Sequence, residues 1–159
     1  MPAYKTEVQI RVKTDCQVAF QAATNADLPD MFQGRGPLPA IANAVNVDGA
    51  WDAPGKARII YLSDGSECTE RVREFSPNGH FSYTVADFTG SLKALASSAD
   101  GEWWFKAVDP EHTDIRWAYQ FNATSTLAAP LIWIIGTLFW KPYMRQALSR
   151  LALRLEHGK

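Results

Sequence analysis

The chain has 159 residues, of which 47% are hydrophobic and 21% charged, and its formal net charge at pH 7 is −1. This length and composition are typical of one globular domain with a substantial core, so we expect residues 1–159 to form a single domain. Basic and acidic residues are scattered, which leaves no electrostatic footprint for a phosphate backbone and argues against a nucleic-acid partner. The six tryptophans give an aromatic share of 12%, and this excess needs a place in the fold.

Cysteine usage and the N-terminal segment indicate the compartment. Cys16 and Cys68 are the two cysteines, and they are far apart with no CxxC spacing. This pattern argues against a structural zinc site or a disulfide scaffold and fits a reducing cytoplasm. The segment "MPAYKTEVQIRVKTD" has neither an apolar stretch nor a small-residue cleavage site of the kind that signal peptides carry. We therefore expect a cytoplasmic location.

The first third of the chain predicts one strand and two short helices. "YKTEVQIRV" alternates apolar and polar residues with period two, as a half-buried strand does. Asp15 is a suitable N-cap for a helix from Cys16 to about Thr24. A second short helix is expected from Asp27, with Pro29 in its first turn, and "GRGPLP" ends it.

The middle of the chain predicts strands separated by turn signals, and the last third predicts a helix. Six consecutive strands imply an antiparallel meander, and their expected bounds are 41–48, 56–63, 67–75, 80–87, 99–108 and 113–122. The C-terminal third is helical in composition. One face of it carries four apolar residues at helical spacing, namely Met144, Leu148, Leu151 and Leu155. A long C-terminal helix therefore closes the chain.

This order of elements predicts an α+β architecture. An antiparallel sheet that is apolar on one face must bury that face, and the C-terminal helix is the element long enough to cover it. We expect a curved sheet of seven strands wrapped around the C-terminal helix, with the helix on the concave face.

Three stretches, in this order, carry a resemblance to a known family. They are "VQIRVKTDCQVAFQAATNADLPDMF", "PGKARIIYLSDGSECTERVREFSPNGHFSYTV" and "GEWWFKAVDPEHTDIRWAYQF". With the C-terminal helix, about residues 4–156 resemble the START-like or SRPBCC superfamily, in its polyketide cyclase/dehydrase and lipid-transport branch. The resemblance implies a helix-grip fold with an apolar cavity between sheet and helix, used to bind lipids, polyketides or other hydrophobic molecules. It implies no particular reaction, because the superfamily has no shared catalytic motif.

The hairpin at "YLSDGSECTERV" decides which side chains face that interior. We interpret "SDGS" as a two-residue turn with Asp64 and Gly65 at its tip, because Asp-Gly suits the positive φ angles of a type I′ turn. In that register Ile59 lies opposite Glu70. One face then carries Ala57, Ile59, Tyr61, Cys68, Glu70 and Val72, and the other carries Arg58, Ile60, Leu62, Glu67, Thr69, Arg71 and Arg73. The first set is less charged, so we expect it to face inward.

Glu70 is thus the one charged residue that we expect on the inner face, and two interpretations stay open. In the first, Glu70 lies at the cavity mouth or pairs with an arginine. In the second, apolar surroundings raise the pKa of Glu70, which bonds a ligand hydroxyl or acts as a general acid/base. The same alternation places these residues of the later strands on the inner face: Phe81, Tyr83, Val85, Trp103, Phe105, Ile115, Trp117, Tyr119 and Phe121. The residues that we predict to contact a ligand are Tyr61, Glu70, Tyr83, Trp103, Trp117, Tyr119 and Phe121. The alternative is that these aromatic side chains fill the core.

Other kinds of site are not indicated. His80, His112 and His157 have no carboxylate or cysteine at metal-ligand spacing, so we expect no metal, and no motif points to a cofactor. Ser63 and Ser66 lack the GxSxG context of a nucleophile. Cys68, if inward, is expected to be a small core residue. A single acid/base candidate favours a carrier or sensor of a hydrophobic molecule, and the alternative is a cyclase or dehydratase that uses Glu70.

The segment from Leu127 to Trp140 contains no charged residue. As a helix it is too short for a transmembrane span, and Pro142 should kink or break it near Leu138 to Lys141. Two interpretations remain for its apolar surface. In the first, the segment is a cavity lid, a core element or a dimer contact, and the protein is a monomer or a homodimer. In the second, the segment docks on a membrane, with Trp133 and Trp140 in the interface and Lys141 and Arg145 near the head groups.

Overall fold

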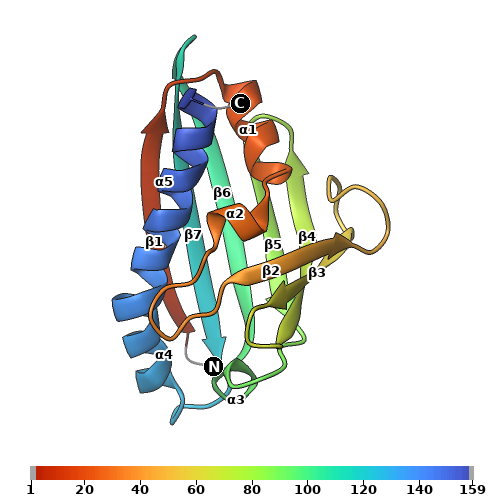
Figure 1. Ribbon diagram of the computed structural model, residues 1–159, viewed down its shortest axis with the longest axis vertical. Coiled ribbons are helices and arrows are strands. Elements are labelled where there is room, and N and C mark those ends of the chain that lie inside the picture. The colour runs from red at the N-terminus through yellow and green to blue at the C-terminus, as the bar shows by residue number, and fades with distance from the viewer. Residues whose placement is uncertain (1–2, 158–159) are drawn as a thin grey trace.

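The structure is a computed structural model that describes residues 3–157. Its centre is a seven-stranded antiparallel sheet in the order β1-β7-β6-β5-β4-β3-β2 (Figure 1). The strands are β1 (Ala3–Val12), β2 (Ile41–Asn46), β3 (Ala57–Leu62), β4 (Glu67–Ser76), β5 (His80–Ala86), β6 (Ala96–Asp109) and β7 (His112–Ala123). Each strand from β2 to β6 pairs with the next strand along the chain, and β7 also pairs with β1. The predicted meander is therefore confirmed.

The two helices after the first strand and the long C-terminal helix lie on one side of this sheet (Figure 1). The helical elements are α1 (Cys16–Thr24), α2 (Leu28–Met31), α3 (Leu92–Leu95), α4 (Ala129–Ile135), the π-helical turn η1 (Gly136–Trp140) and α5 (Lys141–His157). α5 contacts β1, α1 and α2. The predicted fold class, a curved sheet closed by a long C-terminal helix, is therefore confirmed.

Local sequence signals explain most of these elements. In β1, Thr6, Val8 and Val12 are buried and Ile10 is partly buried, while the polar residues that alternate with them are exposed. Asp15 caps α1, because its Oδ1 accepts a hydrogen bond of 2.9 Å from the Val18 amide. The short helix α3 was not predicted, because its residues lie in a stretch that we interpreted as a turn.

The C-terminal helix is distorted where Pro142 enters it. Proline has no amide hydrogen, so the backbone before it loses an ordinary helical hydrogen bond. The chain responds with η1, a π-helical turn, in which the Lys141 amide bonds to the Gly136 carbonyl. The predicted disturbance near residues 138–141 is confirmed, but it is a wider turn and not a break.

Between sheet and helix lies a core with many aromatic rings. The inward-facing residues of β5, β6 and β7 were predicted from alternation and are buried, namely Phe81, Tyr83, Val85, Trp103, Phe105, Ile115, Trp117, Tyr119 and Phe121. Met144, Leu148 and Leu151 of α5 are buried against them, and Leu155 is partly buried. No helix among residues 3–157 is long and apolar enough to cross a membrane.

Candidate ligand-binding site

The β3–β4 hairpin has a different register from the predicted one. Leu62 bonds to Ser66 through its amide, so the loop has three residues, Ser63 to Gly65, and Gly65 takes the positive φ of 89°. Three-residue hairpin loops place glycine at this left-handed position. Arg58 therefore lies opposite Glu70, and Ile60 lies opposite Cys68. The predicted inner face of β4 is confirmed. The register of β3 differs by one residue from the predicted one, so its predicted inner face is wrong.

This shift exchanges the faces of β3. Ile60 is buried, and Arg58 points to the same side as Glu70. Tyr61, which we predicted to face the ligand, alternates to the opposite side and stays partly exposed. Two sets of contacts hold this loop. Outside the hairpin, the Ser63 amide and hydroxyl both bond to the backbone of Ala40, and within it Asp64 accepts a hydrogen bond from the Ser66 amide.

Glu70 faces inward and pairs with Arg58. The guanidinium Nε donates to Glu70 Oε1 at 2.8 Å, and Nη2 lies 2.8 Å from the same oxygen. Side-chain exposure is 11% for Arg58 and 14% for Glu70, which makes this pair better shielded than the other ion pairs of residues 3–157. The arginine-paired interpretation of Glu70 is therefore confirmed. Because both short contacts go to Oε1, the second carboxylate oxygen is not held by them.

Trp51 completes the surroundings of this pair. Its indole ring lies 3.8 Å from the Arg58 guanidinium carbon, in a cation–π contact, and its Nε1–H donates to the Glu70 carbonyl oxygen at 3.1 Å. The ring is 4% exposed although it comes from the loop between β2 and β3. It was not predicted as a site residue, and the signal for it was a large aromatic residue in an otherwise turn-forming stretch.

Two tyrosine hydroxyls share the interior with Glu70. Burial raises the pKa of Tyr83, the negative charge of Glu70 raises it further, and nearby Trp103 and Trp117 indoles act in the opposite sense. Burial also raises the pKa of Tyr119, and the charges of Tyr83 and Glu70 add to this. Gly101 makes room for Tyr83, because a Cβ at residue 101 would lie 2.2 Å from Tyr83 Cζ. Both hydroxyls therefore stay protonated and can donate hydrogen bonds.

Indole N–H groups lie in the same region. The rings of Trp103 and Trp117 stack with centroids 4.7 Å apart, and Trp140 from η1 has its ring 4.8 Å from that of Tyr119. The Nε1 atoms of Trp117 and Trp140 are buried and form no hydrogen bond within residues 3–157, although the Trp117 N–H lies close enough to the Tyr83 hydroxyl to lower the pKa of Tyr83. A buried donor without an acceptor costs about 1–3 kcal/mol, so such groups call for an explanation.

The aromatic rings of the interior pack on one another. Phe81 stacks against Trp103 with centroids 5.6 Å apart, and Trp140 lies parallel to Phe32 at 6.4 Å. Trp140 also contacts Trp117, Phe121 and Tyr143. Trp140 therefore occupies the space between helix and sheet that the resemblance assigns to a ligand.

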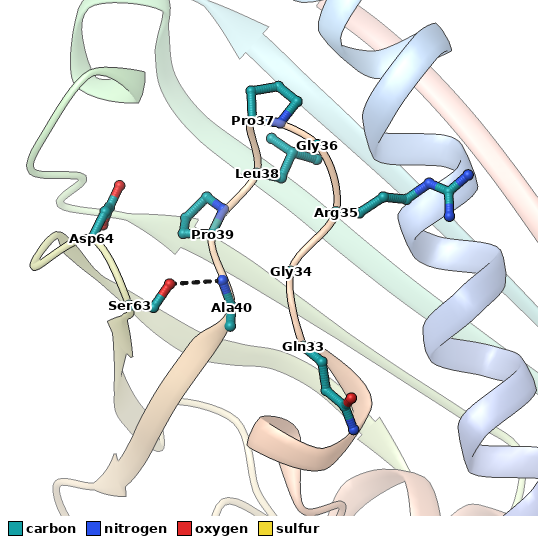
Figure 2. Close-up of a pocket in the computed structure, with 10 residues that line it drawn as sticks. All are labelled: Gln33, Gly34, Arg35, Gly36, Pro37, Leu38, Pro39, Ala40, Ser63 and Asp64. Carbon is teal, nitrogen blue, oxygen red and sulfur yellow. Dashed lines mark hydrogen bonds between the residues drawn. The ribbon is translucent and has the colours of Figure 1, made fainter.

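A pocket of about 500 Å³ lies beside the loop of residues 33–40, between α2 and β2 (Figure 2). Its wall is formed by residues 33–40 together with Ser63 and Asp64 of the β3–β4 hairpin. Figure 2 shows Arg35 on the side of the loop that faces the C-terminal helix and Asp64 on the other side. The 33–40 loop thus connects the hairpin to the helix.

Tyr143 of α5 holds this loop in place. Its hydroxyl accepts a hydrogen bond of 2.8 Å from the Gly34 amide and donates one of 2.9 Å to the Pro39 carbonyl. Gly36 has a positive φ of 56°, and a Cβ there would meet the Phe139 ring at 3.1 Å. The loop therefore rests on η1 and the start of α5, next to the Trp140 side chain.

The structure brings most of the predicted site residues together. Glu70, Tyr83, Trp103, Trp117 and Tyr119 lie on the inner face, and Phe121 packs on Tyr119 at 5.1 Å. Tyr61 does not join them. Arg58, Trp51 and Trp140 were not predicted for the site. We call the polar groups of Arg58, Glu70, Tyr83, Tyr119, Trp117 and Trp140 the inner polar cluster.

The cysteines and histidines are not members of the inner polar cluster. Cys68 is buried and free, and burial next to Glu70 raises its pKa to about 12, so the thiol is unreactive. His80 Nε2 lies 2.6 Å from Glu102, and Glu74 is near enough for all three to contact one ion, although the sequence spacing had indicated no carboxylate near this histidine. The side chain of His157 lies outside the described residues.

The arrangement defines a class of protein: a helix-grip domain with an aromatic interior and a buried polar cluster between sheet and C-terminal helix. The chain belongs to the family described as "Polyketide cyclase / dehydrase and lipid transport", whose family model matches residues 4–156. The predicted resemblance is therefore confirmed. No curated protein matches the chain.

Solved structures share the fold at low sequence identity. The aromatase/cyclase ZhuI from Streptomyces sp. R1128 is 12% identical, with a TM-score of 0.71, and the match covers 99% of this chain and 98% of that one. Norcoclaurine synthase from Thalictrum flavum, in complex with dopamine and hydroxybenzaldehyde, is 11% identical with a TM-score of 0.72, covering 99% and 90%. The protein XoxI from Bacillus cereus is 15% identical with a TM-score of 0.67, covering 95% and 94%.

Proposed function

We propose that the protein binds a small, flat, mainly apolar molecule with at least one hydrogen-bond acceptor, between the sheet and the C-terminal helix. The observation that carries this proposal is that the buried indole donors of Trp117 and Trp140 form no hydrogen bond within residues 3–157. A ligand oxygen would supply the missing acceptor, and the surrounding rings would supply apolar contact.

Space for this ligand requires Trp140 to move. The Trp140 ring packs on Phe32, Trp117 and Tyr119, and a shift of this ring would let an aromatic ligand pack beside it against the same residues. Trp140 ends η1, and π-helical turns are local irregularities that recur at functional sites. The 33–40 loop covers the same region and is held by the Tyr143 hydroxyl, so loop and tryptophan together would open the entrance.

Calorimetric titration with 2-naphthol, two fused aromatic rings with one hydroxyl, tests the proposal. The Y83F/Y119F variant removes both inner hydroxyls, and Y61F is the matched control on the outer side. We expect the double variant to bind about tenfold more weakly, which is about 1.4 kcal/mol, and the control to bind like the wild type. No heat from any member of a panel of hydroxylated bicyclic aromatics would refute the proposal, and equal affinity of all three proteins would show that the two tyrosine hydroxyls do not contact the ligand.

A cyclase or dehydratase is the second candidate, and the Glu70 carboxylate favours it. Arg58 contacts Oε1 at 2.8 Å, so the other oxygen is left for a substrate proton, and two protonated phenols lie in the same interior. The test is turnover of an aromatic-forming poly-β-ketone mimic. A Glu70→Gln variant that still binds 2-naphthol but loses turnover by a factor of about 100 or more would assign an enzyme. Unchanged turnover, or none in the wild type, would leave the binding function.

A further inference from the structure

The surface of α4 and η1 is unusually apolar. Exposed fractions are 90% for Leu127, 51% for Leu131, 58% for Trp133, 42% for Ile134 and 60% for Leu138, and we call these five residues the α4 patch. Next to it lies α3, whose Leu92 and Leu95 are partly exposed, at the same end of the molecule (Figure 1). Several large apolar side chains gathered at one end of a protein mark an interaction surface.

The opposite side of the same segment is fixed to the sheet. Ile132 is 1% exposed, and Gly136 lies directly against Tyr4 of β1, because a Cβ there would come within 2.2 Å of the Tyr4 ring. The Tyr4 hydroxyl and the Thr137 hydroxyl are hydrogen-bonded at 3.1 Å. The segment therefore cannot rotate its exposed leucines and Trp133 inward without breaking these contacts.

The part of the sequence that carries the patch and the helix after it has charges of one sign. From Ile115 to Leu155 the sequence contains no aspartate or glutamate but five basic residues, although the whole chain has a net charge of −1. Arg145 is exposed and Lys141 half-exposed at the start of α5, directly after η1, and Lys93 is exposed on α3. The apolar patch is thus flanked on two sides by basic side chains.

We propose that the α4 patch docks on an anionic membrane surface. Leucine, isoleucine and tryptophan side chains enter the boundary between head groups and acyl chains, and lysine and arginine beside them contact the phosphates. A second copy of the chain fits less well, because a twofold contact through this patch would bring the same basic residues of both copies together. An anionic bilayer satisfies both the apolar and the basic parts of the surface.

Co-sedimentation with vesicles of equimolar phosphatidylcholine and phosphatidylglycerol tests the docking. We expect the wild type to bind and a W133S/L138S variant to bind at least tenfold less. The matched control, V47S/L153S, removes two side chains of nearly equal exposure, 58% and 57%, from elsewhere on the surface and should bind like the wild type. A K141Q/R145Q variant should lose several-fold, and thermal unfolding verifies that each variant folds.

Three results would overturn the proposal. They are no binding by the wild type, equal loss in the patch variant and the control variant, and a wild-type dimer in sedimentation equilibrium that the patch variant abolishes. If the protein passes a ligand to the membrane through this surface, that role rests on the proposed function. Docking itself does not, because the vesicle experiment uses the protein without added ligand. Failure of membrane docking and failure of ligand binding are therefore separate outcomes.

Discussion

Arg58 and Glu70 hold opposite charges in a mainly aromatic interior, with side-chain exposures of 11% and 14%. Removing one partner of such a pair leaves an uncompensated charge, whereas replacing both by apolar residues costs much less. We expect E70L to lower the free energy of unfolding by about 3 kcal/mol and R58M/E70L to recover most of that loss. Urea denaturation measures both variants. Equal losses in the single and double variants would show that the pair is not coupled.

Alkaline pH should lower the free energy of unfolding, because one thiol and two phenol groups are buried in their protonated forms. The folded state raises the pKa of Cys68 to about 12 and raises those of Tyr83 and Tyr119, chiefly by burial. Because the unfolded chain loses these protons at lower pH, the stabilisation is fully present below about pH 9 and falls as pH rises. The free energy of unfolding should decline more steeply between pH 9 and 11 in the wild type than in Y83F/Y119F.

Absorbance at 295 nm gives a second readout of the same groups. The chain has five tyrosines. Tyr83 and Tyr119 should ionise only as the protein unfolds, so part of the tyrosinate absorbance should appear together with the loss of structure. A single titration of all five with the fold retained would contradict the buried position of these two hydroxyls.

At the scale of elements, the 33–40 loop depends on one hydroxyl. Tyr143→Phe removes the acceptor of the Gly34 amide and the donor to the Pro39 carbonyl but leaves the ring in place. We expect a loss of about 1–2 kcal/mol in unfolding free energy and faster amide hydrogen exchange in residues 33–40. The Y61F variant is the control. Unchanged exchange in the loop would mean that other contacts hold it.

The regular elements were predictable because their signals are local. Alternation in β1 and in β5 to β7 identified the buried faces, and Asp15 marked the start of α1 at the correct residue. The register of β3 was not predictable from the hairpin alone. Ser63 bonds to Ala40, 23 residues earlier, and this long-range contact helps set the three-residue loop.

At the scale of the whole molecule, the predicted inner face was right for β4 to β7 and wrong for β3, and the predicted ligand contacts stay a prediction. Glu70 and the aromatic residues of three strands face the interior as expected from alternation. Trp51 and Trp140 were missed as site residues because a long loop and a π-helical turn carry them inward, and neither follows a simple period. Arg58 was missed because of the β3 register.

The molecule thus combines an apolar end beside basic side chains with an interior in which two indole donors, those of Trp117 and Trp140, form no hydrogen bond within residues 3–157. Both features lie along the C-terminal helical segment, with the α4 patch on its outer side and Trp140 on its inner side. Movement of η1 would affect both at once, because Leu138 and Trp140 belong to the same turn. We therefore expect the binding of an aromatic ligand to change the surroundings of Trp140.

The indole N–H resonances of the six tryptophans test the central claim most directly. In a 15N-labelled sample titrated with 2-naphthol, the Trp117 and Trp140 signals, assigned with W117F and W140F variants, should move downfield as their protons gain an acceptor. The Trp133 signal, from a ring that is 58% exposed on the α4 patch, should stay in place. Shifts confined to Trp133, or no shift at Trp117 and Trp140 at saturating 2-naphthol, would contradict binding between the sheet and the helix.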